Sequence, residues 1–140
     1  MAREDARNDE TARFADALVS NANTPVLSDE EAVAVATLPA NSALLIVHRG
    51  PGAGSRFLLD QDITVAGRHP EADIFLDDVT VSRKHAEFVR SGNGFSVRDL
   101  GSMNGIFVAG DRVDAAELSK GTEVLIGKFR LTFYPSEKGL

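Results

Sequence analysis

Four short segments of this chain carry side chains whose chemistry suits a bound phosphorylated peptide. They follow one another in the order Gly67-Arg68, residues 82–85 (Ser-Arg-Lys-His), Gly101-Ser102 and Asn104-Gly105. Arginine presents a planar fork to two phosphate oxygens, and the hydroxyl and cations of residues 82–85 add further donors. A side-chain amide such as that of Asn104 can pair with the main chain of an extended peptide. No positioned base accompanies the set, so the pattern indicates that a phosphorylated chain is held and not cut.

Each segment also has an ordinary structural explanation. Arg68 would serve as a surface arginine after a bend, and Asn104-Gly105 is a strong hairpin-turn signal. Ser82 and His85, three residues apart, raise a further alternative, a serine hydrolase. That chemistry needs a serine on a strained elbow such as Gly-x-Ser-x-Gly and an acid that orients the histidine, and residues 80–83 (Thr-Val-Ser-Arg) lack the elbow. We therefore predict no catalytic residue and expect His85 to bond the loop backbone.

No metal or cofactor site is predicted. The chain has no cysteine, which excludes disulfides and thiolate metal sites. Residues 50–55 (Gly-Pro-Gly-Ala-Gly-Ser) faintly resemble a phosphate loop, but they lack its lysine and precede a strand instead of a helix. Asp73, Asp77 and Asp78 do not have the spacing of a calcium loop, and we expect them to be solvated.

The hydrophobic pattern from residue 43 onward predicts short strands separated by turns. We expect strands at residues 43–48, 56–59, 63–66, 74–76, 86–89, 95–98, 106–108, 124–126 and 130–134. Strands at this spacing, without a long helical period, are typical of an antiparallel β-sandwich, and residues 114–118 are expected to form one helical turn. Because the loops of a sandwich gather at its two ends, Arg68, Ser82 and Asn104 are expected to share one rim.

Most of the negative charge lies at the N-terminus. Residues 1–40 carry three arginines and eight acids, a net charge of −5 of the total of −6. Few large apolar side chains occur there, so we expect residues 1–42 to form a mostly disordered acidic tail. Within it, Ser28 and Glu31 have the spacing of a helix capping box. A folded domain is expected at residues 43–135, followed by a C-terminal tail at residues 136–140.

Composition also limits the partners and the location. The acidic balance argues against nucleic acid binding, which usually needs a basic face. No apolar run approaches the roughly 20 residues that cross a bilayer, so no membrane span is expected. The polar, acidic start does not resemble a secretory signal. We therefore expect a cytoplasmic protein, and a monomer.

Taken together, Gly67-Arg68, Ser82-Arg83-x-His85 and Asn104-Gly105 resemble the signature of the forkhead-associated (FHA) domain, over residues 43–134. The resemblance implies an all-β, FHA-type sandwich of about eleven strands that recognises phosphothreonine in extended peptides. It places the phosphothreonine-binding roles on Arg68, Ser82, Arg83 and Asn104, with Thr80 and Ser102 as further candidates, and the loop-shaping roles on Gly67, His85 and Gly105.

A closer resemblance involves residues 58–61, 66–70, 73–83 and 126–131, which are similar to small actinobacterial FHA regulators of 2-oxoglutarate and glutamate metabolism. It implies a protein that, when unphosphorylated, binds and inhibits the E1 component of 2-oxoglutarate dehydrogenase and modulates glutamate-metabolising enzymes. A Ser/Thr protein kinase would phosphorylate the tail, and the protein's own FHA domain would capture the tail and end the inhibition. The alternative is a generic FHA adaptor that recruits another phosphothreonine protein.

Thr11 is the expected phosphorylation site. The similar regulators carry two adjacent threonines followed by Ser-Val-Phe, whereas residues 10–14 of this chain read Glu-Thr-Ala-Arg-Phe, so Glu10 stands in place of one threonine. Acids precede Thr11, and the apolar Phe14 follows three residues on, a position that FHA domains often read. An ordinary tail threonine is the alternative.

Overall fold

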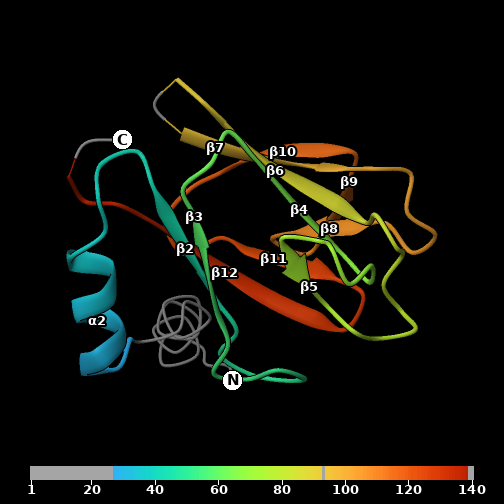
Figure 1. Cartoon of the computed structure of the whole chain (residues 1–140), viewed down its shortest axis with the longest axis horizontal. Coiled ribbons are helices and arrows are strands. Elements are labelled where there is room, and N and C mark those ends of the chain that lie inside the picture. Colours follow the sequence, from blue (N-terminus) through green and yellow to red (C-terminus); the bar gives the residue numbers. More distant parts are fainter. Residues whose placement is uncertain (1–26, 93, 139–140) are drawn as a thin grey trace, which may run out of the picture.

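The structure, a computed structural model, describes residues 27–92 and 94–138. In that part of the chain, eleven strands form two β-sheets and one helix packs beside them (Figure 1). The five-stranded sheet has the order β10-β7-β6-β4-β5, and the six-stranded sheet has the order β3-β2-β12-β11-β8-β9. No helix of the described part is long and apolar enough to cross a membrane.

The two sheets confirm the sandwich that the sequence predicts. The first is built from β4 (Ile63–Gly67), β5 (Ile74–Phe75), β6 (Ala86–Ser91), β7 (Gly94–Asp99) and β10 (Ala115–Leu118). The second is built from β2 (Ala43–Ile46), β3 (Arg56–Leu59), β8 (Ile106–Val108), β9 (Asp111–Val113), β11 (Glu123–Ile126) and β12 (Phe129–Pro135). Within the described ranges, paired strands are antiparallel except β4 and β5, which run parallel with Ala66 opposite Ile74.

Alternating side chains build the core between the sheets. In β7, Phe95 and Val97 are buried whereas Arg98 is exposed. The ring of Phe95 meets the ring of Phe133 of β12 edge-on across the core, with centroids 5.7 Å apart. Because successive side chains of a strand point to opposite faces, this alternation fixes which face of each strand is buried.

Residues 114–118 do not form the helical turn that the sequence predicts. They contain strand β10, which pairs with β7 so that Leu118 lies opposite Phe95. Leu118 is buried in the core. The local sequence Ala-Ala-Glu-Leu favours helix on its own. Pairing with β7 overrides this preference, because it satisfies backbone groups and buries the leucine.

Helix α2 (Asp29–Ala36) begins at the capping box that the sequence predicts. Ser28 Oγ accepts a hydrogen bond from Glu31 N at 3.1 Å, and Glu31 Oε1 accepts one from Ser28 N at 2.9 Å. Each side chain thus satisfies a main-chain N–H that the first turn of a helix leaves without a partner. This capping fixes the start of an eight-residue helix that would be marginal alone.

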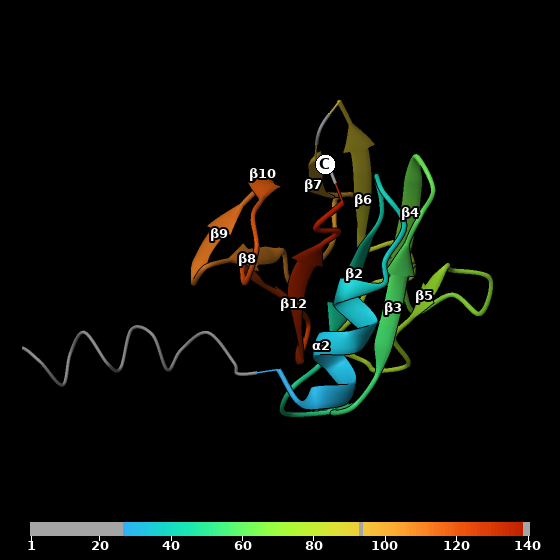
Figure 2. The same cartoon turned by 90° about the vertical axis from the view of Figure 1, so that its left-hand side faces the viewer.

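Helix α2 lies against the outer face of the six-stranded sheet (Figure 2). Val35 and Leu38 are buried against Leu44, Ile46 and Tyr134 of β2 and β12. This apolar patch gives the segment enough buried surface to be ordered. For residues 27–42 the structure therefore differs from the expected disordered tail, and residues 1–26 of that tail lie outside the described residues.

Tyr134 is buried beneath α2. Its hydroxyl lies 2.9 Å from His48 Nε2, and His48 Nδ1 lies 3.9 Å from Glu31 Oε2. Burial, with a smaller contribution from the carboxylate of Glu31, raises the pKa of Tyr134 to about 12. Ionisation of this side chain therefore opposes folding.

The free energy of unfolding is expected to fall as the pH rises from about 10 to about 12, by about 3 kcal/mol in full. In this range the unfolded chain releases the tyrosine proton and the folded chain retains it. The unfolded state then binds fewer protons, so stability decreases with rising pH. Tyr134 is the single tyrosine of the chain, so its absorbance titration reports its pKa directly. Titration near 10 would contradict the burial, and Tyr134→Phe should flatten the stability curve in this range.

Candidate functional site

Three connections meet at the end of the sandwich remote from α2, namely β4–β5, β5–β6 and β7–β8 (Figure 1). Arg68 N donates to Ser82 O at 3.0 Å, and Met103 N donates to Ser82 Oγ at 3.0 Å. Asn104 Nδ2 donates to Thr80 O at 2.8 Å. These bonds bring Arg68, Ser82 and Asn104 to one rim. We call this region the loop junction and define it as residues 67–69, 80–85 and 102–105.

At Gly67 the backbone of β4 passes so close to the β5–β6 connection that no side chain fits. A Cβ atom on Gly67 would lie 2.0 Å from the carbonyl oxygen of Arg83. Two main-chain bonds join the same segments, Arg68 N to Ser82 O and His69 N to Arg83 O, the second at 3.3 Å. Gly67 thereby sets the separation between the backbone that carries Arg68 and the backbone that carries Ser82.

His85 is fully buried and ties two of the loops together. Ser82 N lies 3.0 Å from His85 Nδ1, and His85 Nε2 lies 2.7 Å from Gly105 O. An amide N–H can only donate and a carbonyl can only accept, so Nδ1 carries no proton and Nε2–H donates to Gly105. The ring bonds the main chain of Ser82 and not its hydroxyl, so it does not form a nucleophile and base pair.

Three hydroxyl groups at the loop junction differ in how their hydrogen is used. The Thr80 hydroxyl donates to the carboxylate of Asp78, and the Ser102 hydroxyl donates to the carboxylate of Asp99. Ser82 Oγ accepts a main-chain N–H, and within residues 27–92 and 94–138 no acceptor takes its own hydrogen. Ser82 is therefore the hydroxyl that remains able to donate to a bound anion, whereas those of Thr80 and Ser102 hold the loops.

Asn104 uses part of its side chain within the protein. One amide N–H bonds Thr80 O, which leaves the amide oxygen and the second N–H for another partner. Gly105, which follows, has a φ of +77°, in the left-handed region that costs other residues about 1–2 kcal/mol. Gly105 N donates to Ser102 Oγ at 2.9 Å. The turn thus presents the free half of the Asn104 amide at the rim.

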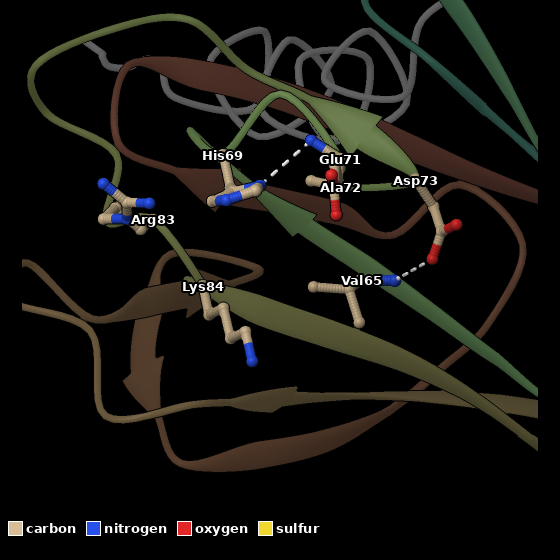
Figure 3. Close-up of a pocket in the computed structure, with 7 residues that line it drawn as sticks. All are labelled: Val65, His69, Glu71, Ala72, Asp73, Arg83 and Lys84. Atoms are coloured by element: carbon tan, nitrogen blue, oxygen red, sulfur yellow. Dashed lines mark hydrogen bonds between the residues drawn. The ribbon is translucent and has the colours of Figure 1, made fainter.

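Arg83 and Lys84 line a pocket of about 340 Å³ beside the loop junction (Figure 3). The remaining lining residues are Val65, His69, Glu71, Ala72 and Asp73. Asp73 Oδ2 accepts from Val65 N at 2.9 Å, and His69 Nδ1 accepts from Glu71 N at 3.0 Å, so these groups fix the β4–β5 connection. Arg68 and Ser82 are not among the lining residues. Among the residues expected to bind phosphate, Arg83 is thus the one that also lines this pocket.

The turn between β11 and β12 contributes a cation that sequence reasoning assigned no role. Lys128 N donates to Thr80 Oγ1 at 3.1 Å, which joins this turn to the loop junction. The hydroxyl and the backbone N–H of Thr80 hold the pKa of the Asp78 carboxyl below its usual value against a smaller effect of burial, and the charges of Lys128 and Arg68 add to the lowering. Nothing in the local sequence around Lys128 signals this contact, because the bond spans 48 residues.

Two expectations concern features away from the loop junction. Thr11, the expected phosphorylation site, lies outside the described residues. Within the described ranges, no group of three or more His, Asp or Glu side chains is arranged to hold a metal ion.

Comparison with known proteins matches residues 64–127, which include the loop junction, to the FHA domain. The chain is 55% identical over 130 residues to the glycogen accumulation regulator GarA of Mycobacterium tuberculosis, covering 91% of this chain and 80% of the relative. It is 62% identical over 96 residues to the oxoglutarate dehydrogenase inhibitor of Corynebacterium glutamicum, covering 69% of this chain and 67% of the relative. A solved structure studied for phosphothreonine-dependent FHA domain interactions matches with a TM-score of 0.61 and 28% identity, covering 66% of this chain and 94% of that structure.

These comparisons agree with the geometry. The two named relatives are a regulator and an inhibitor, which fits a site whose serine and histidine are not paired for catalysis. The matched residues contain the three loops that hydrogen bonds bring together, and the surrounding strands form the expected two-sheet sandwich. The chain belongs to the FHA-domain family.

Proposed function

We propose that the loop junction binds phosphothreonine within an extended peptide. The guanidinium of Arg68 and the hydroxyl of Ser82 would contact the phosphate, Arg83 would add charge, and the free half of the Asn104 amide would pair with the peptide backbone. The observation that carries this proposal is that the Ser82 hydroxyl remains free to donate a hydrogen bond, next to the loop that holds Arg68. Thr80 and Ser102 then act by holding the loops, together with Gly67, His85 and Gly105.

The metabolic target that we propose is oxoglutarate dehydrogenase, through its E1 component, with glutamate-metabolising enzymes as further partners. The support is the 62% identity to a protein named oxoglutarate dehydrogenase inhibitor. We propose that the protein acts in the cytoplasm and as a monomer. A pull-down from lysate with the unphosphorylated chain should recover the dehydrogenase complex. Recovery of phosphoproteins alone would instead assign a generic FHA adaptor.

We further propose that residues 1–42 form a regulatory segment, residues 43–135 the binding domain and residues 136–140 a short C-terminal tail. A Ser/Thr protein kinase would place on Thr11 a phosphate of about −1.5 to −2 charges, which the loop junction captures. Residues 12–26 span at most about 50 Å when fully extended, which exceeds the diameter of about 30–35 Å of a domain this size. Thr11 can therefore reach the loop junction although α2 is anchored remote from it.

The Thr11→Ala variant is expected to keep inhibiting oxoglutarate dehydrogenase after kinase treatment, whereas the unchanged chain should lose its inhibition. Without a phosphate, the tail offers the loop junction no doubly charged ligand to capture. Dehydrogenase turnover, measured with and without kinase treatment of each variant, tests this. Thr24→Ala, which removes another tail threonine, is the matched control and should switch normally. Normal switching of Thr11→Ala would contradict the assignment of the acceptor.

A further inference from the structure

The lysines and arginines of the described residues divide into two groups by their partners. Six make ion pairs with N–O distances of at most 3.8 Å: Arg49, Arg56, Arg90, Arg98, Lys120 and Arg130. In the ranges 27–92 and 94–138, no such pair involves the other six, which are Arg68, Arg83, Lys84, Arg112, Lys128 and Lys138. All of these except Lys138 belong to the loop junction or contact it.

This concentration of cations exceeds what one phosphate needs. A phosphothreonine brings about −1.5 to −2 charges at neutral pH. Arg68 and Arg83 match that charge, and Lys84 lines the neighbouring pocket, which leaves Arg112 and Lys128 without a task in the proposed phosphate site. Five cations gathered on one rim, with six of the other seven in the described part held in ion pairs, produce a positive field that favours a ligand with several negative groups.

Arg112 lies directly over the turn that presents Asn104. It belongs to β9, opposite Phe107 of β8. A Cβ atom on Gly105 would lie 2.5 Å from Arg112 Nε and 2.8 Å from Arg112 Cζ, so the guanidinium occupies the space that the glycine leaves open. Gly105 follows Asn104 immediately, and Arg112 is exposed to solvent. The charge therefore sits one residue beyond the side chain proposed to hold the peptide backbone.

Lys128 is connected to Asn104 through Thr80. Its main-chain N–H bonds Thr80 Oγ1, and Thr80 O accepts the Asn104 amide, so Thr80 connects the β11–β12 turn to the rim. The nearby carboxylate of Asp78 accepts the hydroxyl and the N–H of Thr80, and within residues 27–92 and 94–138 it forms no ion pair with Lys128. The side chain of Lys128 is exposed. It is thus available to a ligand bound at the loop junction.

On the basis of the proposed phosphothreonine binding, we propose that Arg112 and Lys128 form a second recognition element, which selects phosphothreonine peptides that carry acidic side chains within a few residues of the phosphate. The phosphate residues come from loops of the five-stranded sheet, whereas these two cations come from the six-stranded sheet, and Asn104 lies in the β7–β8 connection that joins the two sheets. An extended peptide advances about 3.3 Å per residue, so residues within a few positions of the phosphate reach past Asn104. Carboxylates there would meet two exposed cations, and basic residues would be repelled.

The tail of this chain has the selected chemistry. Asp9 and Glu10 directly precede Thr11. A phosphorylated Thr11 would therefore present two carboxylates next to the phosphate. The same element would disfavour a phosphothreonine with neutral or basic neighbours and so narrow the range of partners.

Binding of synthetic peptides to the full chain tests this proposal. Three peptides share a central phosphothreonine and differ in their flanks: neutral residues, two glutamates before it, or two glutamates after it. The unphosphorylated form of the neutral peptide is the reference. Fluorescence anisotropy at low salt measures each Kd for the unchanged chain, for the double variant Arg112→Gln with Lys128→Gln, and for Lys120→Gln as the control cation. Arg112→Lys keeps the charge but removes the planar guanidinium. This variant therefore distinguishes attraction of the peptide by charge from an effect of guanidinium packing over Gly105.

At least one acidic peptide should bind the unchanged chain about tenfold more tightly than the neutral one. That gain should fall to about twofold or less in the double variant and persist in Lys120→Gln and Arg112→Lys, with the neutral peptide nearly unaffected in all variants. Equal affinity for all three peptides, or an equal gain in the double variant, would overturn the proposal while leaving phosphothreonine binding intact. If the neutral peptide bound no better than its unphosphorylated form, the proposed function itself would fail, and this selection with it.

Discussion

Replacing Arg68 with glutamine is expected to weaken the binding of a phosphothreonine peptide by about tenfold to about a hundredfold. The guanidinium is exposed, and its backbone is held against Ser82 by a main-chain hydrogen bond of 3.0 Å. Each charge-assisted hydrogen bond that it makes to phosphate contributes about 1.5–3 kcal/mol, which corresponds to this range of affinity. Glutamine keeps much of the length of the side chain but loses the charge and the planar fork. Isothermal titration calorimetry with a synthetic peptide measures the loss.

Arg56→Gln is the matched control for this substitution. Arg56 forms an ion pair of 3.4 Å with Glu30 of α2, remote from the loop junction. A surface pair of this kind contributes about 0–1 kcal/mol to stability and nothing to the binding of a ligand at another site. The Arg56→Gln variant should therefore bind the phosphothreonine peptide with the affinity of the unchanged chain. Equal losses in the two variants, or no loss in Arg68→Gln, would remove Arg68 from the phosphate site.

Alanine at Gly67 is expected to destabilise the fold by about 2–3 kcal/mol and to abolish phosphopeptide binding. The new Cβ atom would lie 2.0 Å from the carbonyl oxygen of Arg83, which is backbone and cannot rotate away. Relief requires the β4–β5 and β5–β6 connections to separate. Separation would break the bond from Arg68 N to Ser82 O and move the guanidinium away from the hydroxyl. Denaturant unfolding and peptide titration measure the two effects.

Gly94→Ala provides the comparison within the same sheet. Gly94 begins β7, and a Cβ atom there meets no atom within 4 Å outside its chain neighbours. The substitution should leave both stability and peptide binding close to those of the unchanged chain. If Gly67→Ala behaved like Gly94→Ala, the close approach of the two loops would not matter for the site.

The strands of the two sheets could be predicted because the sequence of each strand shows which of its side chains are buried. Strands such as β7 and β12 alternate apolar and polar side chains, and each is bounded by turn residues. The shared rim followed from this prediction, since the loops of a sandwich gather at its ends. The role of His85 as a backbone-bonding residue was also predictable, because no oriented acid or strained elbow accompanies Ser82.

Other features depend on contacts between distant segments and carry no local signal. Strand β10 lacks β-branched residues and is a strand because β7 pairs with it. Residues 27–42 are ordered because they pack on an apolar patch of β2 and β12, which lies elsewhere in the chain and cannot be recognised from the helix sequence itself. Whether a hydroxyl already donates a hydrogen bond to a carboxylate depends on the positions of Asp78 and Asp99 in the folded chain. The sequence alone therefore does not distinguish the hydroxyls of Ser82, Thr80 and Ser102.

The account depends on a phosphothreonine being held between the loop that carries Arg68 and the loop that carries Ser82. NMR spectra of the full chain, recorded during titration with a phosphothreonine peptide and with its unphosphorylated form, test this most directly. We predict large amide shifts at Arg68, Ser82 and Asn104 with the phosphorylated peptide, and small shifts with the other. Equal shifts with both peptides, or shifts confined to residues remote from the loop junction, would contradict it.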